Sequence, residues 1–390
     1  MQRLLRALIW VASVGCGSRT AYVQAPPTEA DVVIHVPCQG ARCGPPPAAP
    51  PPPPPQIPPP RMLAAGWHHS CALTEDGGVY CWGSNSRGQL GDVGDERTWV
   101  PGRVPGLPRM DAVWAGADQT CARAAEDGRV WCWGDTGLPE DGTEGPRQLA
   151  YADVRQMALN FRRGCLVDDG GRTFCWGDIR HPYGPRWRTP QRVPVDAPVE
   201  IVWNMQRGCA LLQGGELRCW GLPHNYYRTE RAESPTFRLP GIENAAMLAM
   251  KTENQDEVLI VDRRGRVFVS ENGRQRRMQS RHPVLALRRV DGIEDPAQVQ
   301  AGSNVYCART AEGTVACWGS NLAGELGDGT RAARTTPTFL PLAGIREIAV
   351  GQHHVCARDD ERVWCWGSNT DGQVGLERPR EVPEPYQLPW

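Results

Sequence analysis

Twelve of the fifteen cysteines recur in pairs, and such pairs could bind zinc, carry redox chemistry or form disulfides. The pairs are Cys71 and Cys81, Cys121 and Cys132, Cys165 and Cys175, Cys209 and Cys219, Cys307 and Cys317, and Cys356 and Cys365. Zinc sites usually combine Cys-x2-Cys clusters into four ligands, and the paired cysteines do not have this spacing. We therefore predict no metal site and no cofactor.

The spacing within each pair indicates a hairpin. Nine residues separate the partners in four pairs, ten in the second pair and eight in the last. Opposed cysteines would leave turns of three, four or two residues and would lie close enough for a disulfide. A further unit, EVLIVDRRGRVFVS, has Leu259 and Val269 in their place, as expected for a buried cross-strand pair. We predict six disulfides within hairpins, which require an oxidising compartment.

Each pair belongs to a phrase that recurs seven times. The clearest copies are AGWHHSCALTEDGGVYCWGSNSRGQLGD from Ala65, AGSNVYCARTAEGTVACWGSNLAGELGDGT from Ala301 and GQHHVCARDDERVWCWGSNTDGQVG from Gly351. Successive copies start 50, 44, 44, 50, 48 and 49 residues apart, a period typical of propeller blades. The predicted fold class is all-β, with a seven-bladed β-propeller over residues 61–390.

The phrase A-G-x-x-H-x-C-A-L-x-x-x-G-x-V-Y-C-W-G-x-N-x-x-G-Q-L-G resembles the repeat of the regulator of chromosome condensation family, in the cysteine-paired form of exported bacterial members. The resemblance covers residues 61–390 and is degenerate in units two to five. It implies a seven-bladed β-propeller. The founding member is a chromatin-bound exchange factor for a small GTPase. We do not carry that activity over, because 43 basic against 44 acidic side chains do not favour a nucleic-acid partner.

The first residues have the order of an export signal. Arg3 and Arg6 precede an apolar run that is too short to cross a bilayer, so residues 1–15 are predicted to be a signal peptide. The run ends in SVGC, which resembles the lipobox of bacterial lipoproteins, although Ser13 stands where Leu is usual. We expect a lipid on Cys16 and a location at the outer membrane or cell surface. The alternatives are a soluble secreted or periplasmic protein, and a Cys16 that is removed with the signal.

Residues 16–60 are predicted to be a disordered, Pro-rich linker. Residues 45–60 read PPPAAPPPPPPQIPPP, a composition that adopts polyproline II and would form a stalk about 50 Å long at about 3.1 Å per residue. The alternative is that this run docks into an aromatic groove of a partner. Cys38 and Cys43 either close a small loop or remain unpaired.

Two expectations concern packing. The tryptophan after each second cysteine is expected to pack between blades, rather than to stack against sugars. These residues are Trp82, Trp133, Trp176, Trp220, Trp318 and Trp366. Because the first unit begins at Met62 without a Pro-led segment, we expect Pro385 to Leu388 to complete the first blade as a closing strand.

A binding site is expected where the repeat is broken. After Trp-Gly, units two to four replace GSNxxGQLG by GDTGLPEDGTEG, GDIRHPYGPRWRTPQR and GLPHNYYRTERAESP. Equivalent propeller loops emerge on one face, and Tyr, Trp and Arg dominate interface hot spots. The binding-face candidates are Tyr183, Arg186, Trp187, Arg188, His224, Tyr226, Tyr227 and Arg228. The alternative is neutral drift of these loops.

We therefore expect a monomeric, non-enzymatic scaffold of the bacterial cell envelope or surface, whose partner is another envelope or extracellular protein or a glycan. The alternative is a propeller hydrolase or lyase acting on an envelope polysaccharide or ester, in which His68 and His353 would converge. The chain contains no HExxH, G-x-S-x-G, P-loop or aspartate-box motif, so no catalytic residue is predicted. The two histidines are expected to brace turns by hydrogen bonding.

Overall fold

A computed structural model describes residues 9–14, 18–23, 32–34, 57–91, 94–138, 145–177, 187–205, 207–221, 237–238, 244–252, 257–271 and 286–390. The chain divides into two units, Met1–Pro55 and Gln56–Trp390. Every regular element in these residues is a β-strand, and none of them belongs to a helix that could cross a bilayer.

The unit Met1–Pro55 contains an antiparallel sheet of three strands, in the order β1-β2-β3. The strands are β1 (Ile9–Val14), β2 (Ser18–Val23) and β3 (Val32–Ile34). Strand β1 lies within the predicted signal peptide, and the other two lie within residues 16–60, for which composition predicts disorder. The runs SRTAYV and VVI carry the β-branched and aromatic residues that favour strands, a local preference outside the Pro-rich run.

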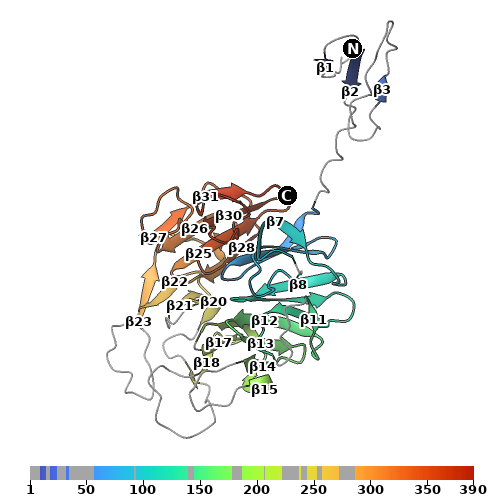
Figure 1. Cartoon of the computed structure of the whole chain (residues 1–390). Helices are drawn as coiled ribbons and strands as arrows, with labels where there is room; N and C mark the ends of the chain where they lie inside the picture. The colour runs from blue at the N-terminus through green and yellow to red at the C-terminus, as the bar shows by residue number, and fades with distance from the viewer. Residues whose placement is uncertain are drawn as a thin grey trace, which may run out of the picture. The chain divides into compact units, whose positions relative to one another are not determined.

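The unit Gln56–Trp390 forms seven four-stranded antiparallel sheets within its described residues, and they follow one another around a ring (Figure 1). The predicted seven-bladed β-propeller is therefore confirmed. The first strands of the blades are β4 (Pro60–Ala65), β8 (Met110–Ala115), β12 (Val154–Asn160), β16 (Pro198–Trp203), β20 (Ala245–Met250), β24 (Pro296–Ala301) and β28 (Glu347–Val350). The second strands are β5 (His69–Thr74), β9 (Gln119–Ala124), β13 (Arg163–Asp168), β17 (Arg207–Leu212), β21 (Val258–Asp262), β25 (Val305–Thr310) and β29 (His354–Arg358).

The outer half of each blade follows directly in the chain. The third strands are β6 (Val79–Ser84), β10 (Val130–Gly134), β14 (Arg172–Gly177), β18 (Leu217–Gly221), β22 (Val267–Glu271), β26 (Val315–Gly319) and β30 (Val363–Ser368). The fourth strands are β7 (Arg97–Arg103), β11 (Arg147–Gln148), β15 (Trp187–Asp196), β19 (Phe237–Arg238), β23 (Ala286–Val290), β27 (Arg334–Phe339) and β31 (Glu381–Gln387). Each blade is thus contiguous in sequence.

The second and third strands form the expected hairpins. In six blades two buried cysteines face each other and form a disulfide, with Cα atoms 4.0 to 4.2 Å apart. The disulfides are Cys71–Cys81, Cys121–Cys132, Cys165–Cys175, Cys209–Cys219, Cys307–Cys317 and Cys356–Cys365. In the fifth blade Leu259 faces Val269 in the same register. The disulfide and the apolar pair therefore fill the same place in a blade.

The core lies between successive blades. In six blades a tryptophan directly follows the second cysteine, and each of these six tryptophans is at most 2% exposed. Trp133 of β10, for example, belongs to one hydrophobic cluster with Leu73 and Val104 of the first blade. The tryptophans therefore pack between blades, as expected from their fixed place in the repeat.

The predicted closing strand is wrong. Strand β31, which contains Pro385, pairs with β30 of the seventh blade, while β7 completes the first blade. The prediction fails because the Pro-led segments do not begin the units. They are the outer strands that end each unit, as Pro101 in β7 shows.

The seventh and first blades meet as other neighbours do. Strand β28 lies against β4, as β4 lies against β8. The C-terminal Trp390 packs on Tyr80 and Trp82, with ring centroids 6.3 and 6.2 Å away, and its Nε1 donates to Pro58 O at 2.8 Å. The C-terminus thus contributes side-chain packing to ring closure, rather than a strand.

Candidate interaction face

One face of the propeller carries the loops that diverge from the repeat. Because neighbouring strands are antiparallel, the loop after each third strand emerges beside the loop that joins the first and second strands. The predicted binding-face residues follow β14 and β18 or begin β15. The side chains of Tyr183, Arg186, Trp187, Arg188, His224, Tyr226, Tyr227 and Arg228 lie outside the described residues.

The described part of this loop face holds a stacked aromatic pair. Trp67 follows β4 and Phe161 follows β12, and both are half-buried. Their ring centroids lie 5.8 Å apart, with 23° between the ring planes. Trp67 N also donates to Ala117 O at 3.1 Å, in the corresponding loop of the second blade. The pair therefore connects the first and third blades across the second.

Sequence reasoning missed this pair. Trp67, Ala117 and Phe161 each stand four residues before the first cysteine of their unit, and the sequence analysis names none of them as a candidate. A signal was present, because this position varies among units while the residue before it is always glycine or asparagine. The repeat does not require an aromatic residue at this position, since Ala117 occupies it in the second unit.

Ionisable groups flank the aromatic pair. His68 Nδ1 lies 3.3 Å from Asp371 Oδ2, outside hydrogen-bonding geometry, and Arg162 Nε lies 3.1 Å from Asp135 Oδ1. Burial raises the pKa of Asp118, and the carboxylates of Asp135 and Asp371 raise it further, against the opposing charges of His68 and Arg87. An apolar centre with charged surroundings is the usual anatomy of a protein-binding patch.

Two buried histidines act as structural braces. His69 Nε2 lies 2.8 Å from Thr120 Oγ1, and His354 Nε2 lies 2.8 Å from Ser70 Oγ. Burial, with smaller contributions from neighbouring histidines, lowers the pKa of both His69 and His354 to about 3. Both imidazoles are therefore neutral near pH 7, and each connects one blade to the next.

His68 and His353 lie beside different carboxylates, and the charges of both lower the pKa of the buried His354. His353 Nδ1 lies 3.4 Å from Glu325 Oε1, so each histidine faces a carboxylate from a loop of the preceding blade. No hydrogen bond or ion pair joins the two histidines in the part of the chain that the structure describes. In that part, no three His, Cys, Asp or Glu side chains are grouped to hold a metal ion.

Comparison with known families identifies the repeat. The family described as "Regulator of chromosome condensation (RCC1) repeat" matches residues 63–89, 297–325 and 345–373, and a second profile with this description matches residues 312–358. The mitochondrial RCC1 domain-containing protein RUG3 of Arabidopsis thaliana is 34% identical over 84 residues, which cover 19% of each protein. Human RCC2 is 28% identical over 120 residues, which cover 28% of this chain and 23% of RCC2. The chain spans less than a quarter of the curated relatives that it matches.

Solved structures support the same fold. The crystal structure of human WBSCR16 has a TM-score of 0.67 at 17% sequence identity, and the match covers 80% of this chain and 94% of that one. The CRINKLY WD40 ectodomain of the Arabidopsis thaliana receptor kinase ACR4 has a TM-score of 0.50 at 15% identity, with 84% and 99% of the chains covered. These identities are low, so the likeness concerns the fold alone. Repeat matches and architecture together show that the chain carries RCC1 repeats and folds as a seven-bladed β-propeller.

Proposed function

We propose that the protein is a non-enzymatic scaffold that binds another protein through its loop face, centred on Trp67 and Phe161. The observation that carries this proposal is the stacked, half-buried pair of these two rings. A stacked aromatic pair presents a large contact area with few rotatable bonds, so little side-chain entropy is lost on binding. Aromatic residues and arginine are also the side chains that contribute most at interface hot spots.

The RCC1-type propeller suits such a role. The loops that carry Trp67 and Phe161 are held by neighbouring blades, as the hydrogen bond from Trp67 N to Ala117 O illustrates. A partner would meet a face that is already arranged for contact. In this proposal the eight predicted residues around β15 and after β18 extend the same face, and Asp135, Asp118 and Arg162 form its charged surroundings.

The six disulfides are typical of an extracellular or otherwise oxidising environment. We further propose that residues 1–15 direct export, that Cys16 is lipidated, and that residues 16–60 hold the propeller away from the bacterial outer membrane or cell surface. The partner would then be an envelope or extracellular protein, with a glycan as the alternative. Metabolic labelling with an alkyne fatty acid tests the anchor. Label that is absent from the wild type, or retained by Cys16→Ala, would contradict it.

The binding proposal is tested with the full chain. Partners are first captured by chemical crosslinking on intact cells and identified by mass spectrometry, and the affinity of the purified partner is then measured. Changing both Trp67 and Phe161 to Ala should weaken binding about tenfold or more, as expected for hot-spot residues. The matched control changes Trp99 and Phe339, exposed aromatics of the outer strands β7 and β27, to Ala.

Equal affinities of the Trp67/Phe161 variant and the wild type would place binding elsewhere and overturn the proposal. A third variant, with Trp187, Tyr226 and Tyr227 changed to Ala, tests whether the divergent loops belong to the same face. If they do, this variant also binds more weakly than the Trp99/Phe339 control. Circular dichroism confirms that each variant retains its strands before affinities are compared.

A further inference from the structure

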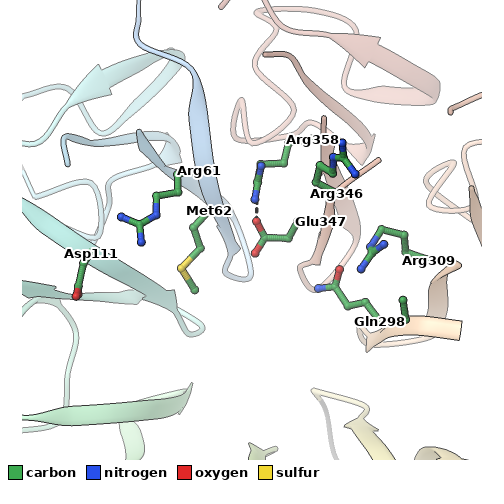
Figure 2. A pocket seen from close by; sticks show the side chains of 9 residues that line it. Arg61, Met62, Asp111, Gln298, Arg309, Arg346, Glu347 and Arg358 are labelled. Carbon is green, nitrogen blue, oxygen red and sulfur yellow. Dashed lines mark hydrogen bonds and ion pairs between the residues drawn. The ribbon is translucent and has the colours of Figure 1, made fainter. Parts of the chain in front are cut away.

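A cavity of about 430 Å³ lies at the opposite end of the blade strands from the loop face. It opens where the first strands of the first, second, sixth and seventh blades begin. Its lining includes Arg61, Asp111, Gln298, Arg309, Glu347 and Arg358. Figure 2 shows Arg358 bonded to Glu347 near the middle of this group, with Arg61 and Arg309 on opposite sides.

The second and the seventh blade each contain an arginine–carboxylate pair at this end of their strands. Arg123 stands two residues after Cys121 in β9, and its guanidinium makes two bonds to Asp111, at 2.7 and 3.0 Å. Arg358 stands two residues after Cys356 in β29, and its Nε donates to Glu347 at 2.8 Å. A bidentate or buried carboxylate is the usual partner of such an arginine.

The sixth blade keeps the arginine without the carboxylate. Arg309 stands two residues after Cys307, and Gln298 faces it across the strands. The residue before Gln298 is Ala297, at the bulge position that Asp111 occupies in the second blade. Gln298 is already bonded to the backbone of Ile348 through both ends of its amide, at 2.8 and 2.9 Å.

Arg309 is consequently short of acceptors. Its Nη1 donates to Thr310 O at 3.0 Å, but its buried Nε has no hydrogen-bond partner among the described residues. The nearby carboxylate of Glu347 already accepts from Arg358 and from Leu63 N. Burial lowers the pKa of the Arg309 guanidinium, the attraction of Glu347 opposes this, and the charges of neighbouring arginines add to it. A bound anion would supply the missing acceptor and would offset the repulsion from the neighbouring arginines.

The charge of the cavity also favours an anion. Arg123 and Asp360 lie outside the lining and pair with Asp111 and Arg346, which line it. With these two partners included, five arginines face three carboxylates, an excess of two positive charges. Arg61 contributes to the excess, because it has no ion pair within the described residues.

We propose that this cavity binds a small dianionic oxyanion, either free phosphate or the phosphate group of a small monoester, with Arg309 as the principal donor. The charge of a phosphate dianion equals the positive excess of the cavity. Its oxygens match the planar fork of donors that a guanidinium presents. The loop face and the oxyanion site would then lie at opposite ends of the blade strands and bind different ligands.

The decisive variant gives Arg309 the carboxylate that its blade lacks. Ala297 is exposed, and Ala297→Asp recreates the Asp111–Arg123 arrangement of the second blade. The matched control is Val199→Asp, at the same bulge position of the fourth blade, where Leu211 stands in the place of Arg309. Val199 is 47% exposed, so both substitutions leave the core intact.

The measurement is isothermal titration calorimetry of the full chain at pH 7.5 with inorganic phosphate, methyl phosphate and acetate, at constant ionic strength. Phosphate or methyl phosphate should bind the wild type at one site. Ala297→Asp should weaken that binding about tenfold or more without lowering the melting temperature, and Val199→Asp should leave it within about twofold. Tighter binding of methyl phosphate would indicate a monoester as the natural ligand, and tighter binding of phosphate would indicate the free ion.

Three results would overturn the proposal. The first is no saturable binding of either phosphate ligand at millimolar concentration. The second is equal weakening by both aspartate variants, which would indicate a diffuse charge effect. The third is acetate binding as tightly as phosphate, because the site would then not select a dianion.

Discussion

His354 of the seventh blade lies 2.8 Å from Ser70 of the first, between Nε2 and Oγ. His69 of the first blade makes the same contact with Thr120 of the second, also at 2.8 Å. The contact between the last and first blades therefore repeats the contact between two ordinary neighbours.

The two interfaces also resemble each other in a backbone carbonyl that accepts two side-chain hydrogen bonds. Gln373 O accepts from Ser70 Oγ and Trp82 Nε1, both at 2.9 Å. In the next interface, the carbonyl of Gln89 accepts from Thr120 Oγ1 at 2.9 Å and Trp133 Nε1 at 2.8 Å. The ring thus needs no exchanged strand, because its final interface is built as the others are.

We predict that His354→Ala and His69→Ala lower the free energy of unfolding by similar amounts. Each change leaves a buried hydroxyl without one partner, which costs about 1–3 kcal/mol. Urea unfolding followed by tryptophan fluorescence measures both values. A destabilising His69→Ala beside a neutral His354→Ala would show that the last interface does not hold the ring as the first does.

Trp390 is expected to stabilise the closed ring through packing. Trp390→Ala removes its contacts with Tyr80 and Trp82 and its hydrogen bond to Pro58, so we expect a loss of about 1–3 kcal/mol for this half-buried ring. Thermal unfolding checks this value. Pro389→Ala, at an exposed neighbour, is the control, and equal melting temperatures for both variants would refute the role of Trp390.

In the fifth blade Leu259 and Val269 replace the disulfide, so we expect the same pair to substitute for a disulfide in another blade. Opening Cys307–Cys317 should cost about 2.7 kcal/mol, because a loop of this size is no longer closed in the unfolded chain. Changing the pair to Leu and Val, as at positions 259 and 269, should cost less than changing both to Ala, which also removes buried apolar volume. Calorimetry of the two double variants decides the order, and a more stable Ala pair would contradict the equivalence of the blades.

Acidification should destabilise the propeller through His69 and His354. Their folded pKa of about 3 lies below the unfolded value of 6.5, so their contribution is complete above pH 6.5 and declines as the pH falls towards 3. Each contributes a slope of at most about 1.4 kcal/mol per pH unit. Burial raises the pKa of Glu200 to about 7, and this carboxyl offsets one histidine between about pH 6.5 and 4.5.

Replacing one of these histidines should reduce the dependence on pH. Gln119 occupies the position of His69 in the second blade, so His69→Gln introduces a residue that the fold already accommodates there. Urea midpoints at pH 7.5, 5.5 and 4 should fall less steeply for this variant than for the wild type. Identical slopes would assign the acid sensitivity to other groups.

Contacts within a blade could be predicted from the sequence, because they depend on local register. The spacing of Cys71 and Cys81 allowed a disulfide to be predicted, and Leu259 with Val269 identified a blade that has none. The sequence predicted that the repeated tryptophans pack between blades, but it did not predict which individual side chains of different blades bond to each other. Ser70 and His354 are 284 positions apart, and no periodicity shows which surfaces of distant units meet.

The aromatic pair and the unpaired Arg309 also depend on contacts or comparisons between blades, so the sequence did not predict them. Trp67 and Phe161 form a pair only because the second blade brings their loops together. The lack of a carboxylate beside Arg309 becomes visible only once Asp111 and Ala297 are known to share a bulge position. The loop residues proposed from broken repeats, such as Tyr226, still require the binding measurements described above.

The central claim is that each blade is completed within its own stretch of chain and is closed by its own disulfide, except for the fifth. Peptide mapping of the non-reduced, alkylated protein by mass spectrometry tests it most directly. We predict six linked peptides, each joining two cysteines 9 to 11 positions apart, and no alkylated thiol among these twelve residues. Free thiols in these positions, or peptides that join cysteines of different blades, would contradict the account.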